Sequence, residues 1–144
     1  MLQGRRRWPQ QQFCPGCFAL IPADAAICPA CGQTIAAVDP ADYREKLLRA
    51  LHHPLSEVRM RAIIALGWRG EIVAVSALIE CALHHPTDVI EGLEIVRSLR
   101  QIETKTGDPR GLLVLAERHP ARAVRAAAHI LRDHPRTPGA NEEK

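Results

Sequence analysis

Aromatic side chains are scarce in this chain. They make up 3% of its 144 residues, whereas hydrophobic residues as a whole make up 47%. Because β-sandwiches are enriched in aromatic and β-branched residues, this shortage argues against such a fold. The abundance of alanine and leucine instead favours helices that pack closely through small side chains. The composition therefore predicts a largely helical protein.

Long apolar runs and a strong net charge are also missing. No stretch reaches the roughly 18 consecutive apolar residues that a membrane-spanning helix needs. A basic cluster near the start is not followed by a hydrophobic stretch, so we expect no secretory signal and a cytoplasmic location. The formal net charge is +3. Charge alone therefore does not indicate a nucleic-acid or membrane binder.

Four of the five cysteines form two Cys-x2-Cys pairs that are separated by ten residues. Two residues between ligands allow one tight turn, or knuckle, to direct both sulfurs at a single metal ion. Two knuckles together supply four thiolates and leave no open coordination position, which describes a structural zinc site. Metal binding also supplies folding energy to a segment too short to bury a core. We predict one structural Zn²⁺ held by Cys14, Cys17, Cys28 and Cys31.

The residues around these ligands, FCPGCFALIPADAAICPACGQTI, closely resemble the short zinc-ribbon modules found at the ends of many bacterial multidomain proteins. Phe18 stands where that family usually has glycine, and we expect Gly16 to absorb the strain of the turn. A rubredoxin-like iron site and a thioredoxin-type redox pair are weaker alternatives. The first needs far more sequence between its knuckles, and the second needs a neighbouring βαβ unit. The fifth cysteine, Cys81, is interpreted as a small buried hydrophobe.

Helical periodicity extends from Asp39 to about residue 134, with Asp39 as the N-cap and Pro40 at the first helical position. The string LHHP at 51–54 returns at 83–86, and RHP follows at 118–120. These repeats separate three predicted helix pairs: 41–53 with 55–68, 71–84 with 87–103, and 109–119 with 120–134. The second helices carry apolar residues at i, i+4 and i+7, which indicates a buried face. The positions are Val58, Ala62 and Ala65, then Val89, Leu93 and Val96, then Val124, Ala128 and Leu131.

The segment SEVRMRAIIALGWRG resembles the HEAT-like repeats first associated with phycobilisome lyases, and ARAVRAAAHIL returns to the same pattern. This resemblance implies an all-α fold, a short right-handed α-solenoid of three HEAT-like helix pairs preceded by the zinc ribbon. The predicted organisation has four parts: a flexible basic arm at 1–12, the zinc ribbon at 13–38, the repeat domain at 39–134 and a polar tail at 135–144.

Two groups of basic residues are candidates for partner binding. One is the arm formed by Arg5, Arg6, Arg7 and Trp8. The other comprises arginines on the second helices, which line the concave surface of such solenoids; they are Arg59, Arg61, Arg122 and Arg125. The alternative interpretation of the arm is a solvated chain terminus with no fixed contacts. The alternative interpretation of the helix arginines is that they are solvated charges or form salt bridges between repeats.

The histidines at 52, 53, 84, 85 and 119 recur near helix ends. There imidazole can meet free carbonyls and the negative end of the helix dipole, so we interpret them as helix caps. A metal cluster between repeats is the alternative interpretation.

The sequence offers no convincing catalytic constellation. It has no glycine-rich phosphate loop, no GxSxG motif and no zinc position open to a substrate. The leading hypothesis is a non-enzymatic protein–protein interaction module, an adaptor or accessory subunit that docks onto a larger assembly, with no small-molecule substrate. One alternative is a nucleic-acid- or ribosome-associated zinc-ribbon protein, although zinc and four thiolates together would lower the net charge by two, to about +1. Another, by resemblance alone, is a lyase-like protein or an enzyme partner.

Overall fold

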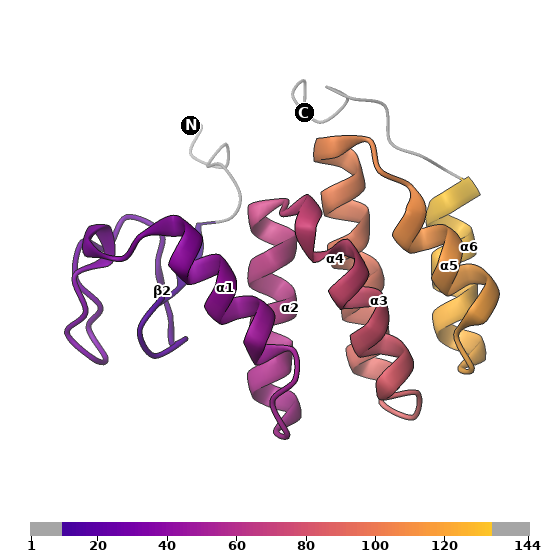
Figure 1. The fold of residues 1–144 in the computed structure, drawn as a ribbon, viewed down its shortest axis with the longest axis horizontal. Coiled ribbons are helices and arrows are strands. Elements are labelled where there is room, and N and C mark those ends of the chain that lie inside the picture. Colours follow the sequence, from indigo (N-terminus) through magenta and orange to yellow (C-terminus); the bar gives the residue numbers. More distant parts are fainter. Residues whose placement is uncertain (1–9, 134–144) are drawn as a thin grey trace, which may run out of the picture.

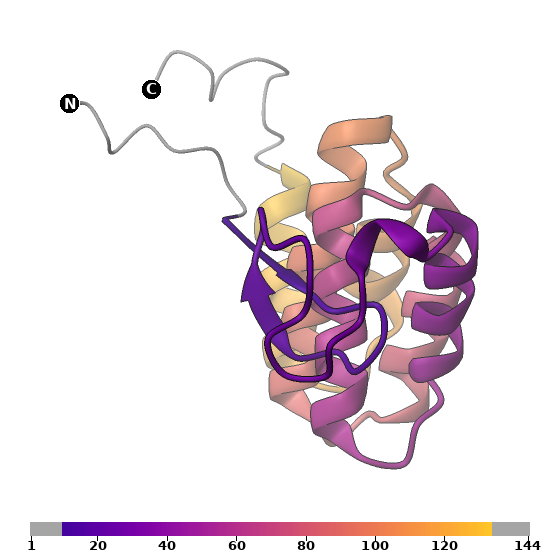
Figure 2. The ribbon, with the colours of Figure 1, turned by 90° about the vertical axis from the view of Figure 1, so that its left-hand side faces the viewer.

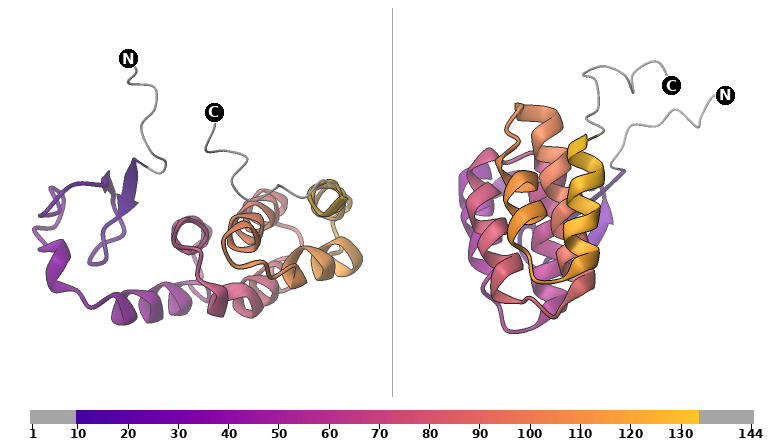
Figure 3. Two further views of the ribbon diagram at one scale, coloured as in Figure 1. Left: turned by 90° about the horizontal axis from the view of Figure 1, so that it is seen from above. Right: turned by 90° about the vertical axis from the view of Figure 1, so that its right-hand side faces the viewer.

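The computed structural model describes residues 10–133, in which a small cysteine-rich module is followed by helices arranged in two rows (Figure 1). The six α-helices are α1 (Pro40–Ala50), α2 (Ser56–Arg69), α3 (Val75–His84), α4 (Val89–Thr106), α5 (Arg110–Arg118) and α6 (Arg122–Asp133). Seen from above, α1, α3 and α5 form one row, and α2, α4 and α6 form the other (Figure 3). The predicted all-α solenoid of helix pairs is therefore confirmed. Within residues 10–133, no helix combines the length and apolarity needed to cross a bilayer.

The cysteine-rich module contains two short strands, β1 (Gln11–Phe13) and β2 (Leu20–Pro22), which pair antiparallel with Gln12 opposite Ile21. An isolated bridge between Ile27 and Thr34 forms a second hairpin-like loop. Each loop carries one Cys-x2-Cys knuckle at its tip. A short 3-10 helix, η2 (Ile35–Ala37), leads from this module into α1, and a second one, η3 (Ile72–Ala74), lies between α2 and α3.

The start of α1 agrees with the sequence-based prediction. The side chain of Asp39 accepts a hydrogen bond of 2.7 Å from the backbone N–H of Ala41, and Pro40 is the first helical residue. The capping carboxylate satisfies an N–H that has no partner within the helix, and proline loses nothing at this position.

The buried face of α4 differs from the predicted one. Leu93, expected inside, is 39% exposed, because the core positions of α2 recur in α4 after 33 residues rather than 31 (62 to 95, 63 to 96 and 66 to 99). The LHHP strings lie 32 residues apart, and two residues separate the second string from the start of α4, whereas one residue separates the first string from the start of α2. That turn includes Asp88, whose side chain caps α4 by accepting a hydrogen bond from the N–H of Glu91.

Close packing of α2 against α4 forms the centre of the core. Ser98 on α4 donates a hydrogen bond of 2.8 Å to the carbonyl of Ile63 on α2. Gly67 lies at the same crossing, where an added Cβ would come within 2.6 Å of the Ser98 hydroxyl. The core is continuous from the cysteine-rich module to α6, because Phe13 and Phe18 belong to the same buried cluster as the helices.

The histidines in the turns act differently from the prediction in two of three cases. Nδ1 of His53 accepts a hydrogen bond from the N–H of Leu55, and Nδ1 of His119 accepts one from the N–H of Ala121, each at 3.0 Å. Both therefore satisfy donors at the start of the next helix instead of carbonyls at the end of the previous one. His85 does cap its own helix, with Nδ1 lying 3.0 Å from the carbonyl of Cys81.

Candidate metal centre and interaction surface

The four cysteine sulfurs of the module converge on one point. Cys14 Sγ lies 3.6 Å from Cys31 Sγ, and Cys17 Sγ lies 3.8 Å from Cys28 Sγ. All four sulfurs lie within 4.8 Å of one another. Zinc–sulfur bonds of about 2.3 Å in a tetrahedron place neighbouring sulfurs about 3.8 Å apart. The donor set and its geometry therefore fit a bound metal ion, and the module is zinc-ribbon-like.

Backbone N–H groups surround two of these sulfurs. Gly16 donates to Cys14 Sγ at 3.2 Å, while Ala30 and Cys31 donate to Cys28 Sγ at 3.3 and 3.4 Å. Burial raises the pKa of Cys28, but hydrogen bonds from the N–H groups of Cys31 and Ala30, together with those from the neighbouring thiols, lower this pKa to about 7. Without a metal ion the negative charge therefore resides on Cys28, whereas, despite the N–H of Gln33, burial and the neighbouring cysteines raise the pKa of Cys31 to about 11.

The two knuckles share an unusual backbone feature at the residue after their second cysteine. Phe18 follows Cys17 with φ of 65°, and Gly32 follows Cys31 with φ of 82°. Gly16 does not adopt this left-handed conformation, so the expectation that it would absorb the strain was wrong. Phe18 bears the strain itself, at a cost of about 1–2 kcal/mol. Its ring is buried and packs under the ammonium of Lys46, 5.2 Å from the ring centroid.

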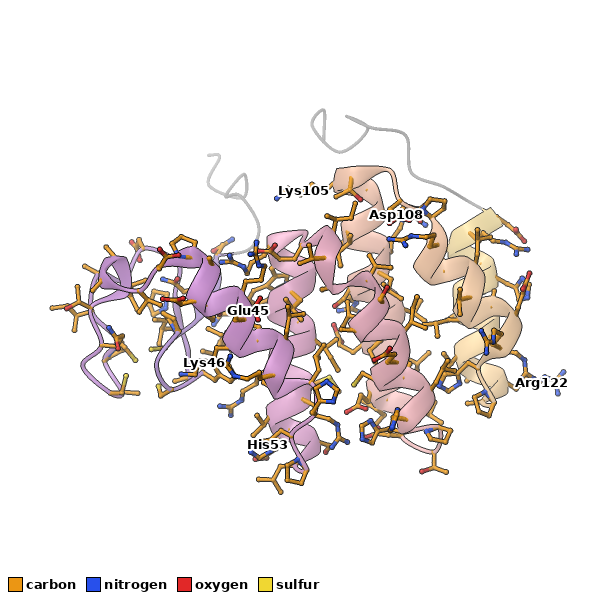
Figure 4. The ribbon with its side chains drawn as sticks, viewed as in Figure 1. Glu45, Lys46, His53, Lys105, Asp108 and Arg122 are labelled. Carbon is orange, nitrogen blue, oxygen red and sulfur yellow. The ribbon has the colours of Figure 1, made fainter. Side chains whose placement is uncertain are left out.

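Side chains from the first two helices bind the backbone of the first knuckle. Lys46 on α1 extends toward the module (Figure 4) and donates to the carbonyls of Pro15 and Gly16 at 2.8 and 2.6 Å. Tyr43, also on α1, donates to the carbonyl of Phe13 at 2.9 Å. Arg61 on α2 donates to the carbonyl of Phe18 at 3.2 Å. The carbonyls of the knuckle are therefore partners of the helices rather than of solvent.

Ring stacking completes this contact. Phe13 stacks on Trp68 of α2 with ring centroids 5.4 Å apart and an interplanar angle of 19°. The module consequently covers the end of the helical array that begins with α1 and α2 (Figure 2). The second knuckle is more open, because Cys31 and its neighbours Pro29 and Ala30 are exposed.

The candidate partner-binding arginines do not form one surface. Arg59 is 6% exposed and donates through Nε to Glu91 of α4 at 2.8 Å. Arg125 donates to the carbonyls of the preceding histidine and proline, as Arg59 also does in the first pair. Arg61 binds the first knuckle, and Arg122 is exposed at the start of α6. Arg5, Arg6, Arg7 and Trp8 lie outside the described residues.

A groove of about 760 Å³ runs across the row formed by α2, α4 and α6. Apolar side chains dominate its lining, with Ile64 from α2, Leu93 from α4 and Ile130 from α6. Arg97 and Glu94 lie among them. Sequence reasoning missed Leu93 and Arg97, although their i, i+4 spacing on one helix face was available. The missing information was the register of α4.

Cys81 is buried on α3, as the sequence predicted. Burial raises the pKa of its thiol to about 12, and the nearby charge of Glu91 acts in the same direction. The thiol is therefore neutral at physiological pH and is not an activated nucleophile.

Comparison with known proteins assigns the helical part of the chain. Residues 24–100 match the family described as HEAT repeats, which is 77 of the 144 residues. The match begins before Cys28 and ends within α4, so it covers α1, α2, α3 and most of α4. Neither the curated proteins nor the solved structures include a significant match. With more than half of its length matched, the chain belongs to the HEAT repeat family.

Proposed function

We propose that this protein is a non-enzymatic interaction module, an adaptor or accessory subunit that binds another protein through the groove across α2, α4 and α6. The observation that supports this function is the exposure of apolar side chains in the groove. Leu93 is 39% exposed and Ile130 is 60% exposed, and both contribute to one continuous lining. Contiguous exposed apolar surface on a folded chain is typical of an interaction site.

The shape and chemistry of the groove suit an amphipathic segment of a partner protein. Such a segment can place its apolar face against Ile64, Leu93 and Ile130. Glu94, Arg97 and Arg100 place one negative and two positive charges next to this apolar strip. These charges favour a partner segment with complementary charges flanking its apolar residues and disfavour one with the opposite arrangement.

In this proposal the cysteine-rich module holds one Zn²⁺ with a purely structural role. Four thiolates fill every position of a tetrahedron and leave none for water or substrate. When bound, the metal supplies a covalent cross-link between the two knuckles. The protein's own residues Tyr43, Lys46 and Arg61 then hold the first knuckle against α1 and α2.

Two leucines with nearly equal exposure provide a matched test of the groove. Leu93 is 39% exposed in the groove, whereas Leu113 is 38% exposed on α5 in the other row. We expect affinity capture from native cells at low stringency to recover the same partner with wild-type chain and with Leu113→Glu, and to lose it with Leu93→Glu. Recovery of the bare chain alone, or undiminished capture by Leu93→Glu, would contradict the proposal.

A further inference from the structure

A second group of metal-ligating atoms lies outside the cysteine-rich module, between α3 and α4. Cys81 lies on α3, and His85 is the C-cap residue of the same helix, four positions later. Cys81 Sγ lies 3.9 Å from His85 Nδ1 and 3.9 Å from Oε1 of Glu91. His85 Nδ1 lies 3.4 Å from the same carboxylate oxygen. Three different ligand atoms thus surround one small volume.

These distances match the edges of a mixed coordination tetrahedron. Bonds of about 2.0 Å to nitrogen and oxygen and about 2.3 Å to sulfur give N···O edges of about 3.3 Å. The same bonds give edges of about 3.5 Å from sulfur to nitrogen or oxygen. The structure has 3.4, 3.9 and 3.9 Å, and small side-chain rotations close the difference.

Arg59 orients the carboxylate for this role. Its Nε donates to Oε2 of Glu91 at 2.8 Å, which leaves Oε1 directed at Cys81 and His85. The Glu91 side chain is 1% exposed, so water cannot easily solvate Oε1. A buried carboxylate oxygen with only long contacts is costly unless a further partner satisfies it. Hydrogen-bond donors that fix the orientation of a ligand in this way are typical of metal sites.

The local charges also favour a cation. Glu91 and Asp88 each carry a negative charge near the single positive charge of Arg59, with Asp88 Oδ2 lying 3.9 Å from the Arg59 guanidinium. This leaves one excess negative charge beside a neutral thiol. A divalent ion that displaces the Cys81 proton brings the group to neutrality, because it adds two charges and creates one thiolate.

A small cavity of about 100 Å³ reaches the cluster. Its lining includes Cys81 and His85 together with the imidazoles of His52 and His84. The cavity gives access to Cys81 and His85 and provides room for a water molecule as the fourth ligand.

From these observations we propose that Cys81, His85 and Glu91 form a second binding site, for a single divalent transition-metal ion of the zinc class. The S, N, O ligand set suits such an ion better than Mg²⁺ or Ca²⁺, which prefer oxygen. Binding replaces the contact between His85 Nδ1 and the Cys81 carbonyl with a metal bond. The site is independent of the proposed protein-binding function.

Counting bound metal on the full-length chain tests this site. Native mass spectrometry in excess Zn²⁺ is expected to show two ions on wild-type protein and one each on Cys81→Ala and His85→Ala. His129→Ala, which removes an exposed imidazole on α6, serves as the control and retains two. His85 is only half-buried, so its variant remains informative even if Cys81→Ala folds poorly.

A spectroscopic measurement on the same variants identifies the ligands. With Co²⁺ as the probe, the second equivalent is expected to add a sulfur-to-cobalt charge-transfer band that Cys81→Ala lacks. If wild-type protein binds a single ion and Cys28→Ser binds none, the second site is overturned. That result would still agree with a metal ion in the cysteine-rich module. A second ion that persists in both Cys81→Ala and His85→Ala would also overturn it.

Discussion

At the scale of single residues, Phe18 combines two opposing contributions. Its left-handed backbone is strained, while its ring is buried against the helices. Phe18→Ala removes the ring and keeps the strain, so we expect a loss of about 3 kcal/mol in the free energy of unfolding. Phe18→Gly removes the ring and also the strain, and it should be about 1 kcal/mol more stable than the alanine variant.

Urea unfolding of both variants measures this difference. Glycine normally destabilises a chain relative to alanine because it gains more backbone entropy on unfolding. An alanine variant more stable than the glycine variant would therefore show that the conformation of Phe18 is not strained.

Cys28→Ser tests the metal centre at the same scale. Loss of one thiolate is expected to abolish zinc binding by the cysteine-rich module, measured as metal content after dialysis, and to unfold that module. Most helical circular dichroism should remain, because the helices have a large core of their own. Chelation of wild-type protein is expected to give the same spectrum. Collapse of the helical signal would instead show that the proposed boundary near residue 38 divides one cooperative unit.

His119 predicts a pH dependence. Its side chain is buried, which lowers the pKa of the imidazole, and the nearby charge of Arg125 lowers it further. The unfolded chain, with a pKa of about 6.5, therefore binds more protons than the folded chain below neutrality. We expect the free energy of unfolding to have its full value above the pKa of the unfolded chain and to decrease as the pH is lowered below that pKa.

Thermal unfolding between about pH 7.5 and pH 5.5 measures this effect, a range that spans the unfolded pKa. His119→Asn keeps an acceptor for the N–H of Ala121 and does not titrate there. Its stability should therefore change less with pH than that of wild-type protein. An equal slope for both proteins would assign the pH dependence to other groups.

At the scale of helices, the Arg59–Glu91 pair joins α2 to α4 inside the protein. Glu91→Gln leaves the guanidinium buried without its counter-charge, so we expect a loss of about 3–5 kcal/mol in the free energy of unfolding. Asp108→Asn, in the pair with Arg110, whose side chain is 62% exposed, should cost no more than about 1 kcal/mol. Denaturant titration compares the two. Equal losses in the free energy of unfolding would mean that burial does not make the Arg59–Glu91 pair more important for stability than the Asp108–Arg110 pair.

The helices show what sequence patterns can and cannot predict. The LHHP strings located the turns, and Asp39–Pro40 located the start of α1, because caps and turns depend on neighbouring residues. The register of α4 depended on one additional residue between the LHHP string and the start of the helix, which periodicity alone does not resolve. Leu93 was consequently placed in the core. The acceptor roles of His53 and His119 were also missed, since they depend on which way each ring faces.

The candidate sites divide in the same way. The spacing of the four cysteines was enough to predict that their sulfurs converge, because all four ligands lie within one short segment of the sequence. The groove joins residues of three helices that are far apart in sequence, and Cys81 meets Glu91 only after α3 packs on α4. Such sites form only when the helices pack together, so the spacing of residues along the sequence does not predict them.

At the scale of the whole molecule, metal removal should loosen one end of the array. The first knuckle binds α1 and α2 through backbone carbonyls, and its Phe13 ring stacks on α2. We expect hydrogen exchange in Cys28→Ser, which loses only the metal of the cysteine-rich module, to accelerate in α1 and α2 and to remain slow in α4. Uniform acceleration along all helices would show instead that the metal stabilises the array globally.

Because the module covers the first helices, further repeats can be added at only one end of the array. Solenoid proteins lengthen by stacking further repeats on an exposed end, and a folded cap at either end blocks that addition. Here the zinc-ribbon-like module occupies the end at α1 and α2, where its aromatic rings fill the place that a preceding repeat would take. Insertion or duplication of helix pairs is thus accommodated only after the first pair. Evolution or design can therefore extend this scaffold only at the end opposite the zinc-ribbon-like module.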